Sequence, residues 1–449
     1  MMNNKSPRLS TRAQENLTGP NIMLDGVRKV NSNKYDAVAN PNGIINLGVA
    51  ENQLMTKELT EIMGTVDHVD PKLFGYGESP SGSRKLREHF ASNIFNRYFN
   101  PVEPVSFDQM VLSAGCSATV DNFTFCVCDP GEGILITTPF YGGFNTDIMA
   151  KSKAKVVVCD LGDCSPFDVS HVDLMQNALQ KAESEGIKVK AVVLSNPHNP
   201  LGRNYSREIL IEFLRFASRN QVHILFDEIY ALSIFDDKLE GLAKAEQPDS
   251  APFISVLSIP DLEQYCEKDL IHVAYGMSKD FCLNGFRCGC ILSPWNHELI
   301  KAMQAIAVFT WMSSTTEAMI TKLLSDPDTI ETFTQTNQKR LAESYTLAVD
   351  TLREHNIPFL PAQGGHFLWA DFRQFIPRSL TASAASGERA AEHLLWHAML
   401  DRGVYVNLGE AFSESKVGFF RLTFAVPVPM LKLGLYRMLH ACQGASQEA

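Results

Sequence analysis

The 449-residue sequence contains no apolar run of the roughly 20 residues that a membrane-spanning helix requires. Its beginning, MMNNKSPRLSTRAQENLTGPN, is polar and has no apolar centre of a secretory signal. Basic residues are in the minority, because 40 Lys and Arg stand against 51 Asp and Glu, for a formal net charge of −11. An acidic chain without basic clusters is poorly suited to nucleic acid. We therefore expect a cytoplasmic protein with neither nucleic acid nor a membrane as its partner.

Cysteine spacing also excludes a common class of site. The two closest cysteine pairs, at 126–128 and 288–290, lack the wider spacing of a zinc site. His393 and His397 have helical spacing, but the residues between them are largely apolar and favour a packed helix. We expect reduced, buried thiols, no disulfide framework and no metal site.

The pattern of apolar residues predicts an α/β fold. Short runs rich in β-branched residues lie at 109–115, 133–141, 155–160, 190–197, 222–230, 271–278 and 288–294. Helical patterns separate several of them, and the clearest covers 206–220, with Ser206 as the expected N-cap. Continuous apolar strands that alternate with helices are typical of a mostly parallel sheet with helices on both faces. We predict a sheet of about seven strands in such a large domain.

The pattern of predicted elements changes after residue 325, where a long polar helical stretch leads into short strands. This pattern indicates a smaller α+β domain. We expect a polar N-terminal arm at 1–40, an N-terminal part of the small domain at 41–75, a large domain at 76–325, and the rest of the small domain at 326–449.

Polar and small residues follow the predicted strands. In an open α/β sheet, ligands bind beyond the carboxyl ends of the strands, so these residues are expected to meet. The candidates are Gly115, Cys116 and Ser117 after the first run, Tyr141 after the second, Asn199 after the fourth, Asp227 and Tyr230 after the fifth, and Ser278, Lys279 and Arg287 after the sixth. Each alone has an ordinary explanation, such as a tight turn, core packing or a helix cap.

Together these residue types meet the needs of one cofactor, pyridoxal 5′-phosphate. It requires a lysine for a Schiff base and an acid for the pyridinium nitrogen. It also requires a phosphate cradle with an arginine, a donor for its ring oxygen and an aromatic ring to stack on.

Three segments carry a family resemblance. NPHNPLG (196–202), DEIY (227–230) and SKDFCLNGFRCG (278–289) resemble the signature segments of fold-type I pyridoxal-phosphate enzymes, the aminotransferase class I/II superfamily. The match covers about residues 40–430, and its most specific part is Lys279 to Arg287.

Within that superfamily, three further segments are similar to 1-aminocyclopropane-1-carboxylate (ACC) synthases. They are NPNGIINLGVAENQL (40–54), TPFYGGF (138–144) and FFRLTFA (419–425). Related fungal C–S lyases fit the same resemblance.

The resemblance implies residue roles. Lys279 would form the Schiff base and then act as general base at the substrate Cα, and Asp227 would pair with the pyridinium nitrogen. Tyr230 and Asn199 would bond the ring oxygen, and Tyr141 would stack on the ring.

The remaining roles concern the phosphate and the substrate. Arg287 would bind the phosphate with help from Gly115, Cys116, Ser117 and Ser278. Arg421 would hold the substrate carboxylate, with Ala50 and Asn199 also near the substrate. The resemblance implies a homodimer, in which Tyr76 would cross from one subunit to the cofactor and substrate of the other.

Two segments depart from the family pattern. Gly276 stands where the family has a phosphate-binding serine, and NTDIMAKSKAK (145–155) lacks the arginines of ACC synthases. The context of Tyr76, FGYGESPSG, is also altered. These departures bear on the substrate and leave the cofactor unaffected.

Several reactions share the same beginning, removal of the Cα proton. We expect a lyase of the ACC-synthase-like type that acts on a sulfur-bearing amino acid, by C–S cleavage or by ACC formation from S-adenosylmethionine. An aminotransferase of a bulky or aromatic amino acid is the alternative among enzymes. A non-catalytic binding protein with the same fold is the alternative of another class, and the complete set of site residues disfavours it.

Overall fold

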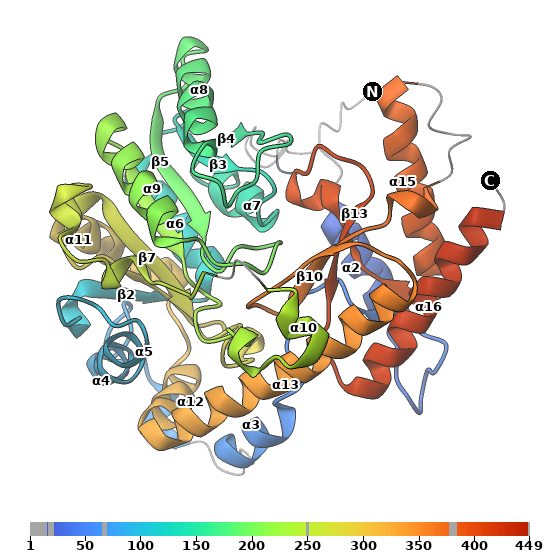
Figure 1. Ribbon diagram of the computed structural model, residues 1–449. Coiled ribbons are helices and arrows are strands. Elements are labelled where there is room, and N and C mark those ends of the chain that lie inside the picture. The colour runs from blue at the N-terminus through green and yellow to red at the C-terminus, as the bar shows by residue number, and fades with distance from the viewer. Residues whose placement is uncertain (1–15, 17–21, 65–69, 248–250, 377–383, 448–449) are drawn as a thin grey trace, which may run out of the picture.

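A seven-stranded sheet forms the larger unit of the protein (Figure 1). The computed structural model describes residues 16, 22–64, 70–247, 251–376 and 384–447. The strands, in the order in which they lie side by side, are β2 (Met110–Ser113), β8 (Gly289–Leu292), β7 (Ile271–Gly276), β6 (His223–Asp227), β5 (Val189–Ser195), β3 (Gly133–Thr137) and β4 (Lys155–Cys159). The β8 strand runs antiparallel to both of its neighbours, β2 and β7, and the other described pairs in this sheet are parallel. The prediction of a mostly parallel sheet is confirmed, and every strand overlaps one of the predicted runs, with β5 beginning one residue earlier, at Val189.

Helices cover both faces of this sheet. One face packs against α6 (Cys116–Val127), α7 (Gly143–Met149) and α11 (His297–Ile306), and the other against helices that include α8 (His171–Ser184) and α9 (Arg207–Asn220). Neighbouring strand residues alternate between the two cores, as Ile134 and Leu135 do. Both faces of the sheet are therefore buried away from solvent, which explains the continuous apolar runs in its strands.

The local signals at α9 act as expected. The Ser206 hydroxyl accepts a hydrogen bond from the Ile209 backbone N–H at the start of the helix. Leu210, Phe213 and Leu214 then turn one fully buried face toward the sheet. An N-cap and an amphipathic period are thus enough to define this helix.

A second unit is built around a smaller sheet. Its strands, in order, are β12 (Asn407–Leu408), β13 (Phe419–Thr423), β10 (Phe367–Asp371) and β9 (Phe359–Leu360), and all its neighbours are antiparallel. The helices α13 (Pro327–Glu354), α15 (Ala384–Asp401) and α16 (Val428–Gln447) contribute to its hydrophobic core. Figure 1 shows α13 running below both units.

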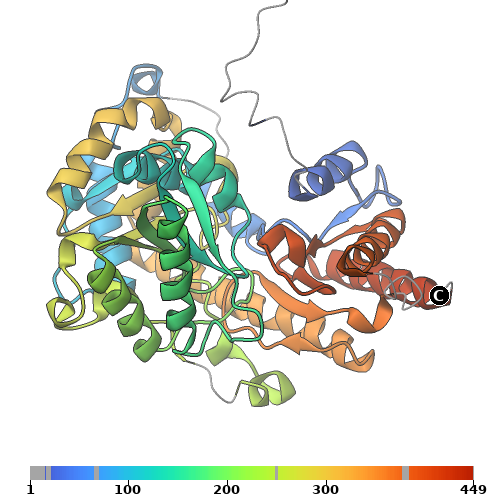
Figure 2. The same ribbon diagram turned by 90° about the horizontal axis from the view of Figure 1, so that it is seen from above.

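The N-terminal segment joins this second unit. β1 (Ile45–Asn46) pairs in parallel with β11 (Val404–Tyr405), and α2 (Ile22–Ser32) lies beside these C-terminal elements in Figures 1 and 2. The helix α2 falls inside the segment predicted as a polar arm, whose residues 1–15 and 17–21 lie outside the described part.

The other described α-helices are short or lie at the edge of the large unit. They are α3 (Thr56–Met63), α4 (Arg84–His89), α5 (Asn96–Tyr98), α10 (Gly241–Ala245) and α12 (Ser314–Leu324).

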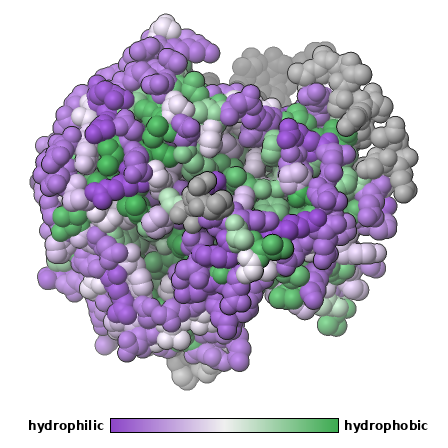
Figure 3. Space-filling model, viewed as in Figure 1, coloured by the Kyte–Doolittle hydropathy of each residue, from purple (hydrophilic) through white to green (hydrophobic). Residues whose placement is uncertain are grey.

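The surface is mainly polar on the face shown in Figure 3, where hydrophobic residues form smaller groups among hydrophilic ones. None of the helices in the described ranges combines the length and the apolar character needed to span a bilayer.

Candidate active site

A cavity of about 270 Å³ lies where the two units meet, beyond the carboxyl ends of β5 and β6 and beside the turn that follows β7. Most of the predicted site residues line it. The lining residues are Met23, Leu24, Val27, Val49, Ala50, Cys116, Ser117, Val120, Tyr141, Phe144, Asp147, Asn199, Asp227, Ile229, Tyr230, Ser278, Lys279, Asn284, Arg287, Asn407 and Arg421. Residues that are far apart in the sequence thus share one concave site, as ligand sites in α/β proteins do.

Lys279 reaches this cavity because of how β7 turns into β8. Gly276 pairs with Gly289 in the antiparallel ladder, so the connection 277–288 leaves the sheet edge and returns to it. The Lys279 Nζ donates a hydrogen bond of 2.7 Å to the Ala50 backbone carbonyl. Burial, aided by the positive charge of Arg421, lowers the pKa of the Lys279 amine to about 8. This amine is a nucleophile and base near neutral pH.

Asp227 is the last residue of β6, and its carboxylate faces the cavity with one oxygen unsatisfied. Among the described residues, Oδ1 is buried and has no hydrogen-bond partner, and Oδ2 accepts a long bond of 3.5 Å from the Ser195 hydroxyl. Burial raises the pKa of this carboxyl to about 7. A buried acceptor without a partner is costly, so its retention here suggests a ligand that donates to Oδ1.

The turn before α6 forms a cradle with a guanidinium beside it. Gly115 has φ of 95°, a conformation that favours glycine, and a Cβ on it would lie 2.3 Å from an Arg287 guanidinium nitrogen. On Gly289, a Cβ would lie 2.5 Å from the Cys116 backbone nitrogen. The two glycines therefore let the start of α6, the β8 strand and Arg287 approach closely. The helix N-terminus, the Ser117 side chain and this guanidinium can together hold an anion.

The Gly276 departure has a packing explanation. A Cβ on Gly276 would lie 2.8 Å from the Cys116 Sγ and 2.7 Å from the Cys288 carbonyl oxygen. The Cys116 thiol, which donates to the Tyr275 carbonyl at 3.2 Å, occupies the space that the family's serine would need. Burial raises the pKa of this thiol well above its usual range, so it remains protonated.

Arg421 lies in β13 of the second unit and is only 2% exposed. Its Nη1 donates to the Asn199 Oδ1 at 2.9 Å and its Nη2 to the Gly48 carbonyl at 2.7 Å. The Nε is buried and has no partner in the described ranges, and the guanidinium lies over the rings of Phe367 and Phe412. A buried guanidinium with an unused N–H suits a carboxylate ligand.

Comparison with known proteins places this geometry in a family. The model of the family "Aminotransferase class I and II" matches residues 42–434. The chain belongs to the aminotransferase class I and II family. It is 32% identical over 434 residues to the mouse (Mus musculus) "1-aminocyclopropane-1-carboxylate synthase-like protein 1", covering 94% of this chain and 81% of the relative. It is 28% identical to the "1-aminocyclopropane-1-carboxylate synthase CMW33" of Cucurbita maxima over 90% of this chain and 79% of the relative.

Solved structures agree on the fold. An aspartate aminotransferase double mutant of Thermus thermophilus superposes with a TM-score of 0.74 at 19% identity, covering 97% of this chain and all of that one. The predicted membership in the fold-type I pyridoxal-phosphate enzymes is confirmed.

The cofactor of this aminotransferase-family enzyme is pyridoxal 5′-phosphate, as predicted. The residues present fit it. The unpartnered Asp227 Oδ1 suits the N–H of a protonated pyridine ring, and the Arg287 cradle suits a phosphate. The Lys279 amine lies in the same cavity and is held by a single described hydrogen bond, to a backbone carbonyl.

The aromatic candidates differ in where they lie. Tyr230 is buried at the cavity, edge-on to Phe367, and Tyr141 lines the same cavity edge-on to Phe144. In this aminotransferase-family chain, Tyr76 does not join them. It is 93% exposed and stacks on Trp311 with ring centroids 5.4 Å apart.

The sequence interpretation missed several cavity residues of the enzyme. Asn407 is the register neighbour of Arg421 across β12 and β13, and Asn284 donates to Glu51 Oε1 at 2.8 Å. Burial raises the pKa of the Asp147 carboxyl to about 7, although the nearby Ser117 side chain opposes this shift. No sequence signal marks these residues, because their place depends on which segments pack together.

One cluster lies away from the cavity. Among the described residues, Glu392, His393 and Glu410 form a group with the spacing of metal ligands. Their polar atoms already bond protein groups, since Glu392 accepts from Arg389 and from the Gly418 N–H, and His393 contacts Glu410 at 2.6 Å.

Proposed function

We propose that this enzyme is a lyase of the ACC-synthase-like type, which removes the Cα proton of an amino acid and then eliminates a sulfur leaving group. The elimination would be either C–S cleavage or ACC formation from S-adenosylmethionine. The observation that carries the proposal is the convergence of Lys279, Asp227 and Arg421 on one cavity. The similarity to proteins named as ACC synthases and ACC synthase-like supports the choice of reaction.

Each residue has a chemical task in this proposal. Bound pyridoxal phosphate supplies an electron sink that acidifies the Cα–H of an attached amino acid. The Arg421 guanidinium fixes the substrate carboxylate, and the Lys279 amine accepts the Cα proton. The Asp227 carboxylate holds a proton on the ring nitrogen, which keeps the sink effective. The side-chain oxygen of Asn199 accepts a hydrogen bond from Arg421. Its amide nitrogen is therefore the group that can donate to the ring oxygen, together with Tyr230.

A second candidate is an aminotransferase of a bulky amino acid. Met23 and Val27 of α2 line the cavity together with Phe144 of α7. These apolar walls favour a large apolar side chain on the substrate. The same Lys279 amine would then return the proton to a different carbon, so the residues assigned above serve both reactions.

We also propose a homodimer with the active site at the subunit interface. Phe74, Tyr76 and Phe309 are 77%, 93% and 84% exposed, and the stacking of Tyr76 on Trp311 brings the segment of the first two beside that of Phe309. We name these three residues the aromatic patch, and exposed aromatic side chains of this kind are typical of interfaces. The patch lies close to the phosphate cradle, because the Thr310 carbonyl accepts from the Ala114 backbone N–H at 2.9 Å. In this arrangement Tyr76 would serve the partner's site.

The cytoplasmic location stays a prediction, which cell fractionation would test.

An absorption experiment tests the proposed chemistry. Purified protein is loaded with pyridoxal phosphate, and a visible absorption band is expected. Borohydride reduction should remove this band and leave the cofactor covalently bound to Lys279. S-adenosylmethionine, a cysteine S-conjugate and an aromatic amino acid are then added separately. ACC from the first, or pyruvate and a thiol from the second, supports the lyase, whereas a keto acid from the third supports the aminotransferase. Absence of a band and of all products would favour a binding protein.

A further inference from the structure

Residues 50–58, which we name the strap, run from the active site into the first turn of helix α3. At the site end, the Ala50 carbonyl accepts the hydrogen bond from Lys279 Nζ at 2.7 Å. The next residue, Glu51, accepts from the Asn284 side chain at 2.8 Å. The strap thus touches the reactive amine and the loop that carries it.

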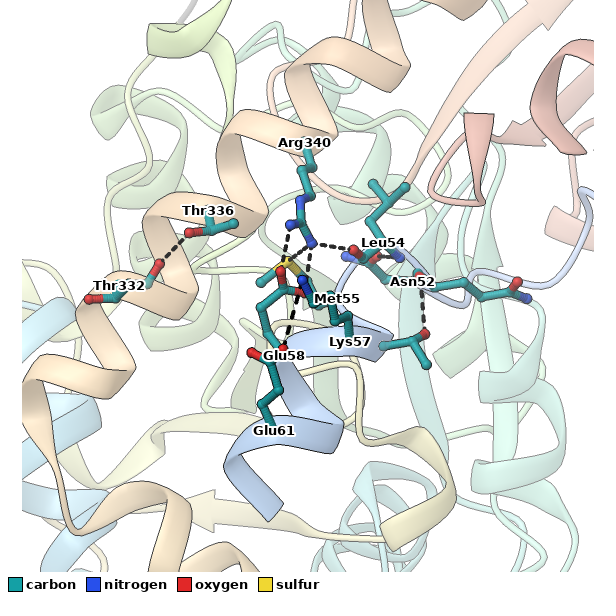
Figure 4. Close-up of polar contacts among 11 residues, drawn as sticks. Asn52, Leu54, Met55, Lys57, Glu58, Glu61, Thr332, Thr336 and Arg340 are labelled. Carbon is teal, nitrogen blue, oxygen red and sulfur yellow. Dashed lines mark hydrogen bonds and ion pairs between the residues drawn. The ribbon is translucent and has the colours of Figure 1, made fainter. Parts of the chain in front are cut away.

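The far end of the strap is held by Arg340 of α13 (Figure 4). The guanidinium makes a two-pronged pair with Glu58, at 2.7 Å and 2.5 Å, and also donates to the Leu54 carbonyl at 2.6 Å. The side chains of Arg340 and Glu58 are 34% and 25% exposed, so the pair is partly shielded from water. The hydrogen bonds from Arg340 lower the pKa of the Glu58 carboxyl, which keeps both partners charged.

The same helix contacts the middle of the strap and the turn of Lys279. Asn337, one turn before Arg340, accepts from the buried Asn52 side chain at 2.7 Å. The amide of Asn337 also lies 3.5 Å from the backbone carbonyl of Asp280, the residue after Lys279. One face of α13 therefore orders both partners of the bond between Ala50 and Lys279.

We infer that Arg340 is a positioning residue for Lys279, a role that rests on the proposed use of this amine as the reactive base. The hydrogen bonds from its guanidinium to Glu58 and Leu54, which we name the fork, fix the strap. The fixed strap in turn holds the Ala50 carbonyl against the Lys279 amine. Without the fork, residues 50–58 lose their strongest described attachment to α13. The carbonyl then leaves the amine for part of the time, and the amine becomes open to water and to reagents.

The chain offers a matched control on the same helix. Arg353 makes an equivalent two-pronged pair with Glu246, at 2.7 Å and 2.6 Å, with side chains 21% and 35% exposed. This pair joins α13 to the segment after α10 and does not contact the strap. Arg353 also pairs with Asp350 of its own helix, and Arg340 also donates to Leu54, so each substitution removes an Arg–Glu pair and at least one further contact of α13. A general loosening of α13 would therefore follow from either substitution.

The test compares Arg340→Ala with Arg353→Ala in the full chain stripped of cofactor. Hydrogen exchange is followed in peptides that cover 50–58, and acetylation of Lys279 by acetic anhydride is followed by mass spectrometry. We expect both rates to rise about tenfold in Arg340→Ala, since local opening becomes easier by that factor when a charged fork is lost. In Arg353→Ala both should stay within about twofold of wild type.

Restored charge provides a second check. The exchanged pair Glu58→Arg with Arg340→Glu should recover slow exchange and slow acetylation, whereas Glu58→Arg alone should not. If Arg340→Ala does not fold, Arg340→Lys serves, with a smaller increase expected.

Equal changes at the two arginines, or faster exchange of 50–58 without faster acetylation of Lys279, would overturn the inference. These measurements need neither substrate nor cofactor, so failure of the proposed reaction leaves their outcome unaffected.

Discussion

At the scale of single residues, burial and charge explain why Lys279 and Asp227 are suited to chemistry. The amine is buried and faces the charge of Arg421, so its pKa lies at about 8. The Asp227 carboxyl is buried with one oxygen unsatisfied, so its pKa lies at about 7. Such displaced pKa values are common in catalytic groups and rarer elsewhere.

Replacement of Lys279 by alanine should abolish turnover and spare the fold. Loss of a general base costs on the order of 10²–10⁴-fold in rate, and loss of the covalent link adds to this. Steady-state assays would measure the rate, and far-UV circular dichroism would check the fold. A variant with the wild-type rate would remove the proposed mechanism.

Replacement of Asp227 by asparagine should lower the turnover rate on the order of 10²-fold, because a neutral amide does not hold the ring nitrogen protonated. Asp227→Glu, which keeps the charge, should retain more activity than Asp227→Asn. An unchanged rate in Asp227→Asn would mean that the pairing with the ring nitrogen is misassigned.

At the scale of elements, the ends of β6 and β7 carry most of the site. The β6 strand delivers Asp227 to the cavity and then turns Glu228 into the protein interior, where Ser255 and the Val256 N–H hydrogen-bond its carboxyl. Burial nevertheless raises the pKa of Glu228 to about 8. The Glu228 carboxyl therefore serves the packing of the protein interior, next to the Asp227 carboxyl that we propose pairs with the ring nitrogen.

The raised pKa of Glu228 predicts how stability changes with pH. Between its ordinary value of 4.5 and about 8, the folded state keeps a proton that the unfolded state releases. The contribution of Glu228 to the free energy of unfolding therefore falls as pH rises through this window and is level above it. Glu228→Gln removes this contribution, so urea unfolding should show the variant gaining stability relative to wild type from pH 5 to pH 8. A constant difference across that range would contradict the prediction.

At the scale of the whole molecule, the site is an interface between two units. Arg421 comes from the second unit and bonds Asn199 of the first, while the strap passes between them. In the proposed homodimer, a second copy of the chain would be a third contributor, through the exposed residues Phe74, Tyr76 and Phe309.

The homodimer can be tested on this patch. Phe309→Glu should place a charge in the interface and convert the protein to a monomer of 49.9 kDa in sedimentation equilibrium. Leu242→Glu, at another exposed apolar residue, is the control and should leave the mass unchanged. If Tyr76 serves the partner's site, activity should fall together with the dimer, and a wild-type mass in Phe309→Glu would place the interface elsewhere.

Local signals in the sequence determined much of the fold. The seven apolar runs became the seven strands of the large sheet, because a strand buried on both faces must be apolar throughout. Ser206 marked the start of α9 for an equally local reason. The predicted domain boundaries were not tested by the structure and stay predictions.

The sequence by itself also indicated the cofactor. The segments that carry Asp227 (227–230) and Lys279 to Arg287 (278–289) are each recognisable within a short stretch of chain. Only the tertiary structure decided what surrounds them. The Ala50 carbonyl lies on Lys279, the Cys116 thiol fills the space beside Gly276, and Arg340 holds the strap, although each pair is distant in sequence. Such contacts depend on which elements pack together, and packing has no local signature in the chain.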